Sequence, residues 1–472
     1  MGTKLPWDKE WIIESLSDSV IYMAYYTLSN YIKSRKIGPD QLTDGFFDYV
    51  LLGEGDPSEV SKVSKIDKEL LKKIRDEFTY FYPLDSRHSG RDLVPNHLTF
   101  FIFNHVAIFP KELWPKQIVV NGSVLMEGKK MSKSLGNIIP LREAIRKFGA
   151  DPLRLAILST SELLQDADFS PSLAKSLNVK LERFYEFAMS VINLQEGYED
   201  VELSNLDRWL ISRLQRIIKA VKESMDKLRI REAINYSLYE LDQDIQWYMR
   251  RSPMEDSSEI RKKAMAKVLK TLIEVRVRLL APFAPYICEE IWEKMGKEGL
   301  VSNTDWPVYD EKKVDEKAEE MEEMITRTLE DTLNIIKVTK IKPSRIHYYT
   351  SAGWKWEAYL KALEILETGV SDIGEMMKRL TEDKSMRKMS KELYRFVQRV
   401  YDEVRETPFD LRQKRLRVKI IDELNVLRDS TEFFEKELGV KVEVYSEEDS
   451  KRFDPMDKAN LAQPYRPAIY ID

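Results

Sequence analysis

The sequence is poor in the residues that build disulfides and metal centres. Of its 472 residues, one is a cysteine, Cys288, and four are histidines: His88, His97, His105 and His347. A single cysteine excludes an internal disulfide and any Cys-x-x-Cys zinc or redox site. So few histidines also argue against a histidine-rich metal centre. We expect Cys288 and His105, which lie in apolar stretches, to be packing residues of the core, and we assign no metal ligands.

Long apolar runs are also missing. No stretch reaches the 18 or so consecutive apolar residues of a membrane span, and Met1 is not followed by the charged, apolar and small-residue pattern of a secretory leader. Hydrophobic residues make up 43% of the chain and charged residues 33%, which is typical of a folded protein with many surface helices. These features predict a cytoplasmic protein that does not contact a membrane.

The charge balance does not by itself indicate a nucleic-acid partner, because the net charge is −5. Lysine and arginine concentrate in residues 213–222, 261–270 and 411–419, and acidic residues in 315–324. Each such run fits the solvated face of an amphipathic helix. We see no internal repeat and no low-complexity segment.

A short strand precedes a lysine-rich loop. Residues 117–126 (QIVVNGSVLM) are predicted to form a hairpin turning at Asn121-Gly122, and the loop EGKKMSKSLGN (127–137) follows directly. Helical spacing then appears up to Phe148, Gly149 is placed as a helix C-terminal residue, and Asp151-Pro152 as the start of a second helix. The predicted order is strand, loop, helix, turn, helix.

The middle of the chain is predicted to be helical. Residues 206–225, 231–251 and 261–295 show apolar residues at spacings of three and four, which indicates a bundle of long antiparallel helices. Two prolines within 281–286 predict a break in the third helix.

The last part of the chain mixes strands and helices. An acidic helix (about 311–337) leads into strands at 344–351 and 440–446, with helices at 354–366 and 430–439. This pattern predicts a small α+β domain from about residue 343.

The lysine loop has the chemistry of an anion site. Lys129, Lys130 and Lys133 cannot all be buried, and Gly128 and Gly136 leave the backbone free to move. Mobile ammonium groups suit a triphosphate, because charge shifts onto the leaving pyrophosphate when the α-phosphate is attacked. An exposed loop with no ligand is the plain alternative on lysines and glycines alone.

Five consecutive residues of the loop favour a phosphate-binding site over an exposed loop with no ligand. Lys130-Met131-Ser132-Lys133-Ser134 is the KMSKS signature of class I aminoacyl-tRNA synthetases. The resemblance extends over nearly the whole chain, and within the class it is to the archaeal and eukaryotic type of leucyl-tRNA synthetase. The stretches that carry it are residues 13–27, 89–137, 281–292 and 466–472.

This resemblance implies an α/β plus α architecture. Residues 1–170 would form the second half of a class I nucleotide-binding (Rossmann-type) catalytic domain that carries the KMSKS loop, and residues 171–310 a helical-bundle domain of the anticodon-binding type. Residues 311–342 would be a linker helix, and 343–472 a small α+β C-terminal domain that binds tRNA.

The resemblance also implies a reaction, the ATP-dependent activation of leucine to leucyl-adenylate and its transfer to leucine tRNA. Lys130 and Lys133 would neutralise the phosphates of ATP, which enters with Mg²⁺ as a substrate, so no tightly bound cofactor is expected. The ATP site would comprise Lys130, Met131, Ser132, Lys133 and Ser134 together with Gly90, Asp92 and His97. Ser19 and Tyr22 would line the leucine pocket.

Contacts with tRNA are expected from basic residues in the two later domains. Arg250 and Arg251 lie at the end of a predicted helix, and Arg412, Lys414 and Arg415 in the late basic run. They are candidates for phosphate contacts, which position an RNA without reading its bases.

One required element is missing. A class I catalytic domain also uses a His-x-Gly-His element, and this sequence contains none. Three explanations are open: one subunit of a split synthetase whose partner brings that element and the editing domain, a truncated or engineered fragment, and a duplicated half that binds tRNA or regulates without catalysis. An intact lysine loop favours the split subunit. A nucleotidyltransferase from outside translation would use the loop but not the helical bundle.

Overall fold

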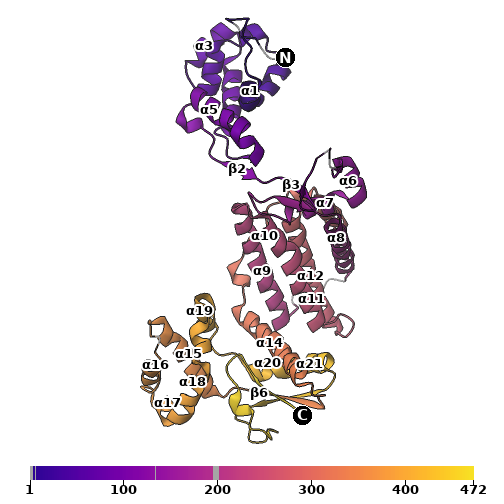
Figure 1. Cartoon of the computed structure of the whole chain (residues 1–472), viewed down its shortest axis with the longest axis vertical. Coiled ribbons are helices and arrows are strands. Elements are labelled where there is room, and N and C mark those ends of the chain that lie inside the picture. The colour runs from indigo at the N-terminus through magenta and orange to yellow at the C-terminus, as the bar shows by residue number, and fades with distance from the viewer. Residues whose placement is uncertain (1–3, 6, 133, 135, 195–200, 371) are drawn as a thin grey trace. The chain divides into compact units, whose positions relative to one another are not determined.

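The computed structural model describes residues 4–5, 7–132, 134, 136–194, 201–370 and 372–472. The chain divides into two compact units (Figure 1), one formed by Met1–Leu181 and Met225–Glu232, the other by Glu182–Ser224 and Ala233–Asp472. Within the described ranges, every helix is too short or too polar to cross a lipid bilayer.

The first unit combines a helical cluster with two small sheets. Its helices are α1 (Ser15–Ser34), α2 (Asp44–Phe47), α3 (Pro57–Ser64), α4 (Lys68–Phe81), α5 (Thr99–Ile108), α6 (Leu141–Phe148) and α7 (Ala150–Leu158), and its strands are β1 (Arg87–Gly90), β2 (Ile118–Asn121), β3 (Val124–Met126), β4 (Lys129–Lys130) and β5 (Ala167–Phe169). The helix α1 packs against both α4 and α5 (Figure 1). Its buried side chains recur every four residues at Ala24, Leu28 and Ile32, so one face of the helix enters the core.

The first sheet is a parallel pair. Strand β1 pairs with β2 from Arg87↔Ile118 to Gly90↔Asn121, and α5 lies in the crossover between them. Parallel strands joined by a helix form a βαβ unit, whose carboxyl ends meet at one edge. The residues after Gly90 and after Asn121 therefore emerge together.

The prediction of a hairpin at Asn121-Gly122 is wrong. Strand β2 pairs with β1, whereas β3 pairs antiparallel with β4 and parallel with β5, so the chain changes sheets at Gly122. A Cβ on Gly122 would lie 2.1 Å from the carbonyl oxygen of Gln165. The glycine thus permits a close backbone contact. From the sequence alone, an Asn-Gly pair with this role looks the same as one that forms a turn.

The predicted order after the loop is confirmed. Helix α6 ends before Gly149, whose φ of 83° favours glycine, and α7 follows. Helix α7 already begins at Ala150, so Asp151 is a buried residue of its first turn and not its N-cap.

The second unit contains the predicted helical bundle. Its elements are the later part of α8 (Pro171–Ile192), α9 (Asn205–Asp226) up to Ser224, the last two residues of α10 (Ile230–Ile234), the π-helical turn η6 (Asn235–Glu240), α11 (Leu241–Arg251), α12 (Glu259–Leu280), α13 (Pro285–Lys294) and α14 (Glu316–Thr339). The break expected near residues 281–286 separates α12 from α13. Its cause is proline, which cannot donate a helical hydrogen bond.

The same unit ends in a three-stranded sheet covered by helices. These elements are β6 (Arg345–Thr350), α15 (Gly353–Glu367), α16 (Ile373–Leu380), α17 (Lys384–Lys388), α18 (Ser390–Glu406), α19 (Phe409–Val418), α20 (Glu423–Asp429), α21 (Thr431–Leu438), β7 (Lys441–Ser446) and β8 (Ala468–Ile471). Strand β6 is central, parallel to β7 and antiparallel to β8. The expected strands and helices are confirmed, and β8 is an addition that the pattern analysis missed.

Candidate active-site loop

The lysine loop begins on a tight hairpin. Strands β3 and β4 pair through Leu125↔Lys130 and Met126↔Lys129. The two residues between them, Glu127 and Gly128, have φ of 50° and 74°. A two-residue turn with both φ positive matches the right-handed twist of the strands it joins. The loop therefore follows a tight turn. It begins after β4, whereas the sequence predicted that it begins directly after the strand that ends at Met126.

An asparagine closes the base of the loop. The side-chain amide nitrogen of Asn137 donates to the carbonyl oxygen of Lys130 (3.1 Å), and its amide oxygen accepts from the backbone N–H of Ser132 (2.9 Å). The hydroxyls of Ser132 and Ser134 lie 3.1 Å apart. Lys130 is exposed and Met131 half-buried, while Lys133 lies outside the described residues. One side chain thus fixes the backbone on both sides of Met131.

Gly90 and Asp92 lie at the carboxyl end of β1. A Cβ on Gly90 would come within 2.6 Å of a carboxylate oxygen of Asp92, so that carboxylate lies against the glycine backbone. Asp92 is exposed, while His97 is half-buried, with its Nδ1 3.4 Å from a guanidinium nitrogen of Arg87. Because a guanidinium only donates, this ring nitrogen acts as an acceptor.

Two aspartates that the sequence analysis missed support this region. Asp166 accepts from the guanidinium of Arg91 (3.0 Å) and from the backbone N–H of Ser123 (2.8 Å), so it joins the segment after β1 to the segment after β2. Asp168 accepts from the N–H of Gly128 in the hairpin turn (2.8 Å). Asp166 directly precedes β5 and Asp168 lies within it, and acidic residues two positions apart along extended chain point to one side, which is the signal that could have identified them.

The two residues expected in the leucine pocket lie on α1, where Ser19 is half-buried and Tyr22 is exposed. The hydroxyl of Ser19 donates to the carbonyl of Leu16 in its own helix (3.2 Å), and Tyr22 is 55% exposed. Among the described residues, no hydrogen bond joins either of them to the lysine loop. Their role stays a prediction.

The candidate tRNA contacts each pair with a carboxylate of this chain. Arg250 forms a two-bond ion pair with Glu437, Arg251 with Glu322 (2.6 Å) and Arg412 with Glu367 (2.7 Å). Lys414 lies 2.7 Å from Glu320, and the buried Arg415 lies 3.6 Å from the same residue. The acidic run of α14 therefore neutralises part of the late basic run. Whether these cations also meet phosphates stays a prediction.

The two residues assigned to packing are confirmed in that role. His105 is fully buried, with Nδ1 2.8 Å from the carbonyl of Phe101 and Nε2 3.2 Å from the hydroxyl of Tyr82. Burial lowers the pKa of His105, which favours the neutral ring. Cys288 is fully buried in the second unit. Among the described residues, no three of His, Cys, Asp and Glu gather as metal ligands would.

Comparison with known proteins identifies two domains. Residues 62–170 match the family described as tRNA synthetases class I (I, L, M and V), and residues 207–348 match the anticodon-binding domain of tRNA ligases. The expected fold class is confirmed at this level: a class I catalytic fragment and an anticodon-binding domain, mostly helical with small sheets.

Curated relatives match the chain from end to end. It is 44% identical to a leucine–tRNA ligase of Methanosarcina barkeri, 43% to one of Pyrococcus abyssi and 41% to one of Archaeoglobus fulgidus. Each match covers 100% of this chain and 48%, 47% and 46% of the respective relative. The chain therefore spans about half the length of the curated relatives it matches.

A solved structure is also similar. It is described as a ternary complex of Agrobacterium radiobacter K84 agnB2 LeuRS-tRNA-LeuAMS, and it is 21% identical with a TM-score of 0.47, over 75% of this chain and 37% of that chain. The sequence matches carry the assignment: over its whole length this chain is a homologue of archaeal leucine–tRNA ligases, and it contains a class I synthetase catalytic fragment and an anticodon-binding domain.

Proposed function

We propose that this chain is the part of a leucine–tRNA ligase that contributes the KMSKS loop. In the assembled enzyme it would activate leucine with ATP and transfer it to leucine tRNA. The observation that carries this proposal is the unbroken KMSKS sequence. It follows a hairpin, and Asn137 closes the base of its loop by two hydrogen bonds to the backbone. In this proposal, residues 1–170 serve catalysis, 171–310 and 343–472 bind tRNA, and 311–342 link them.

The exposed ammonium of Lys130 supplies positive charge to the phosphates of ATP, which enters as its Mg²⁺ complex. When the leucine carboxylate attacks the α-phosphate, negative charge moves onto pyrophosphate, and a lysine held beside it stabilises that charge. Lys133 has the same role in the proposal. Gly90 and Asp92 would meet the adenosine, at the sheet edge where nucleotides bind in parallel folds. Met131, Ser132, Ser134 and His97 complete the proposed ATP site, and Ser19 and Tyr22 the leucine pocket.

A complementary polypeptide would supply the rest of the site. This chain has no His-x-Gly-His element, and among the described residues β1 and β2 each pair with one neighbour only. Parallel sheets are normally buried and have more than two strands. The partner would therefore add strands to this pair, bring the missing histidines and carry the editing domain.

The neighbouring helices offer the partner an apolar face. Large side chains on α1 and α5, which pack together, are solvent-exposed: Tyr26 at 71%, Phe103 at 69% and Val106 at 43%. Apolar side chains gathered on one face mark an interaction surface. Since α5 lies in the crossover between β1 and β2, the same partner could cover this surface.

The test is leucine-dependent exchange of pyrophosphate into ATP. We expect none from this chain alone and robust exchange after addition of a polypeptide that covers the remaining half of an archaeal leucine–tRNA ligase. Exchange by the isolated chain would contradict the need for a partner. If the mixture binds leucine tRNA but never exchanges, the chain is instead a non-catalytic tRNA-binding or regulatory paralogue.

A further inference from the structure

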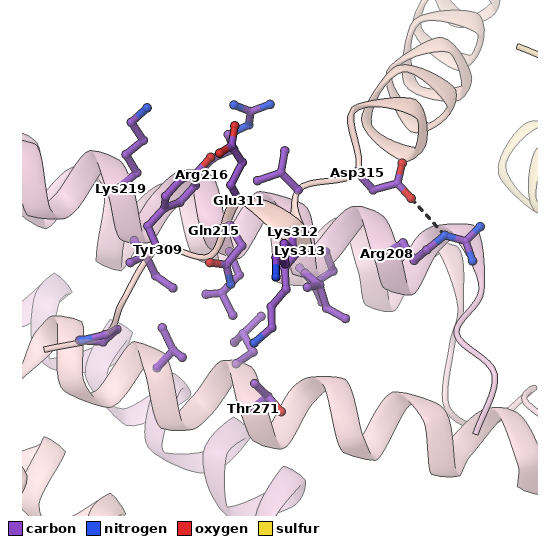
Figure 2. Close-up of a pocket in the computed structure, with 18 of the residues that line it drawn as sticks. Arg208, Gln215, Arg216, Lys219, Thr271, Tyr309, Glu311, Lys312, Lys313 and Asp315 are labelled. Atoms are coloured by element: carbon purple, nitrogen blue, oxygen red, sulfur yellow. Dashed lines mark hydrogen bonds and ion pairs between the residues drawn. The ribbon is translucent and has the colours of Figure 1, made fainter. Parts of the chain in front are cut away.

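A loop of the second unit crosses the helical bundle and is tied to one helix. Three hydrogen bonds join this strap, residues 307–315, to side chains of α9. The backbone N–H of Asp310 donates to the side chain of Gln215 (2.8 Å), that of Asp315 donates to the hydroxyl of Ser212 (2.9 Å), and Arg208 donates to the Asp315 carboxylate (3.1 Å). Figure 2 shows the last of these at one end of the strap.

The strap roofs a cavity of about 1190 Å³ between α9 and α12. On the α12 side, Val268, Thr271, Leu272 and Val275 line it at spacings of three and four, so one face of that helix forms a wall. Figure 2 shows Thr271 on the opposite side of the space from Lys312 and Lys313. The volume exceeds the roughly 300–1,000 Å³ of common small-molecule sites, so it suits a segment of a larger ligand.

The cavity is basic although the chain is acidic. Eight lysines and arginines line it against three acidic residues, whereas the whole chain has a net charge of −5. Several of the arginines are already paired with carboxylates. Among the described residues, Lys219 and Lys312 form no ion pair, and the nearest carboxylate of Lys313, that of Asp310, is 3.8 Å away. All three lysines are exposed, so the ammonium groups of Lys219 and Lys312, and the weakly paired one of Lys313, can reach an anion.

An aromatic ring lies beside this positive charge. The ammonium of Lys219 lies 5.4 Å from the ring centre of Tyr309 in the strap, and Figure 2 shows both at the same end of the cavity. A ring for a base, lysines for phosphates and an apolar wall are the three contacts that unpaired nucleotides need. An acidic peptide would use the lysines but would have no use for a flat ring beside an apolar wall.

We propose that the cavity under strap 307–315 binds one or two unpaired nucleotides of the tRNA. Tyr309 stacks on a base, and Lys219, Lys312 and Lys313 contact the adjoining phosphates. This inference rests on the proposed function, because it takes tRNA as the ligand. It adds a site to the bundle that does not depend on Arg250, Arg251 or the late basic run.

The experiment measures binding of a leucine tRNA transcript to the full chain at several salt concentrations. Tyr309→Ala should weaken binding roughly fivefold to a hundredfold, the effect of losing one base stack, while Tyr309→Phe keeps the ring and should bind as the wild type. Lys219→Ala combined with Lys312→Ala should reduce the slope of log affinity against log salt by about two. Lys317→Ala is the matched control, because Lys317 is an exposed lysine of α14 outside the cavity.

A second measurement does not depend on affinity. A transcript carrying 4-thiouridine is crosslinked by light, and the attached peptide is identified by mass spectrometry. A crosslinked peptide that includes Tyr309 supports the site. If the wild type binds leucine tRNA but the Tyr309 and lysine variants bind equally well and no strap peptide is labelled, the inference is wrong and the proposed function stands. If the wild type binds no tRNA, both are wrong.

Discussion

The side-chain amide of Asn137 spans the lysine loop, donating to the carbonyl of Lys130 at 3.1 Å and accepting from Ser132 two residues later. This contact closes a loop that otherwise holds few fixed groups, since Lys130 and Ser134 are exposed. If the proposed function holds, Asn137 is a positioning residue, because it contacts only the backbone and would act through the placement of Lys130.

We expect Asn137→Ala, in the assembled enzyme, to reduce the turnover of leucine-dependent exchange about ten- to a hundredfold, because a misplaced charge loses transition-state stabilisation. The KM for ATP should change less than kcat. Asn303→Ala is a suitable control, since Asn303 is an exposed residue of the second unit. A rise in KM at unchanged kcat would show that Asn137 serves binding instead.

Lys130→Ala should lower the same exchange roughly 10²–10³-fold, the usual effect of removing one donor to developing negative charge. Lys129→Ala removes the adjacent exposed lysine of the same strand and should have a much smaller effect. Equal losses in the two variants would mean that the loop contributes only general positive charge.

Phe103→Glu should disrupt association with the complementary polypeptide. Phe103 is 69% exposed, so the variant should melt at the wild-type temperature, but a carboxylate in an apolar interface should weaken association tenfold or more, on the order of one hot-spot residue. Val63→Glu changes a comparably exposed apolar residue on α3, away from the α1–α5 face, and should associate normally. Normal association of the Phe103 variant would show that the partner binds elsewhere.

The pair Arg250 and Glu437 separates a tRNA role from a structural one. If Arg250 meets a phosphate, Arg250→Ala should weaken tRNA binding and reduce its salt slope by about one, whereas Glu437→Ala frees the guanidinium and should not weaken binding. Thermal melting checks the fold of both variants, and an exposed ion pair of this kind is worth about 1 kcal/mol or less. Weaker tRNA binding in both variants, or in neither, would contradict a phosphate contact.

The buried carboxyl of Glu423 should make stability depend on pH. Burial raises the pKa of Glu423 to about 7, although the carboxyl accepts hydrogen bonds from the N–H groups of Ser351 and Tyr465. Since the folded state holds this proton more tightly than the unfolded chain, the contribution of Glu423 to stability falls as pH rises from about 4.5 to about 7.

Glu423→Gln removes this proton equilibrium. Relative to the wild type, the variant should become more stable between pH 5 and 8, by roughly 2–3 kcal/mol on the scale of such a pKa difference. Urea unfolding at several pH values measures this difference. A gap between the two proteins that does not change with pH would show that the carboxyl is charged throughout.

Local pattern predicted most of the helices and the type of loop. Apolar residues at helical spacing located the bundle, and prolines located the break between α12 and α13. The error at Asn121-Gly122 has a physical reason: both a turn and a close backbone approach select glycine, and only the position of Gln165 in space distinguishes them. The pairing of Arg250 with Glu437 could not be predicted from local pattern either, because 187 positions separate the two residues along the chain.

Sequence alone was enough to relate this chain to archaeal leucine–tRNA ligases, through the KMSKS residues and a match that covers the whole chain, because a local signature can be recognised without the fold. Tertiary structure alone decided how that signature is held: which glycine turns the hairpin, that Asn137 closes the loop, and that Asp166 joins two strand ends. It also decided that strap 307–315 roofs a basic cavity. Such features depend on residues that are far apart along the chain and close in space, and a single sequence does not show which residues become close.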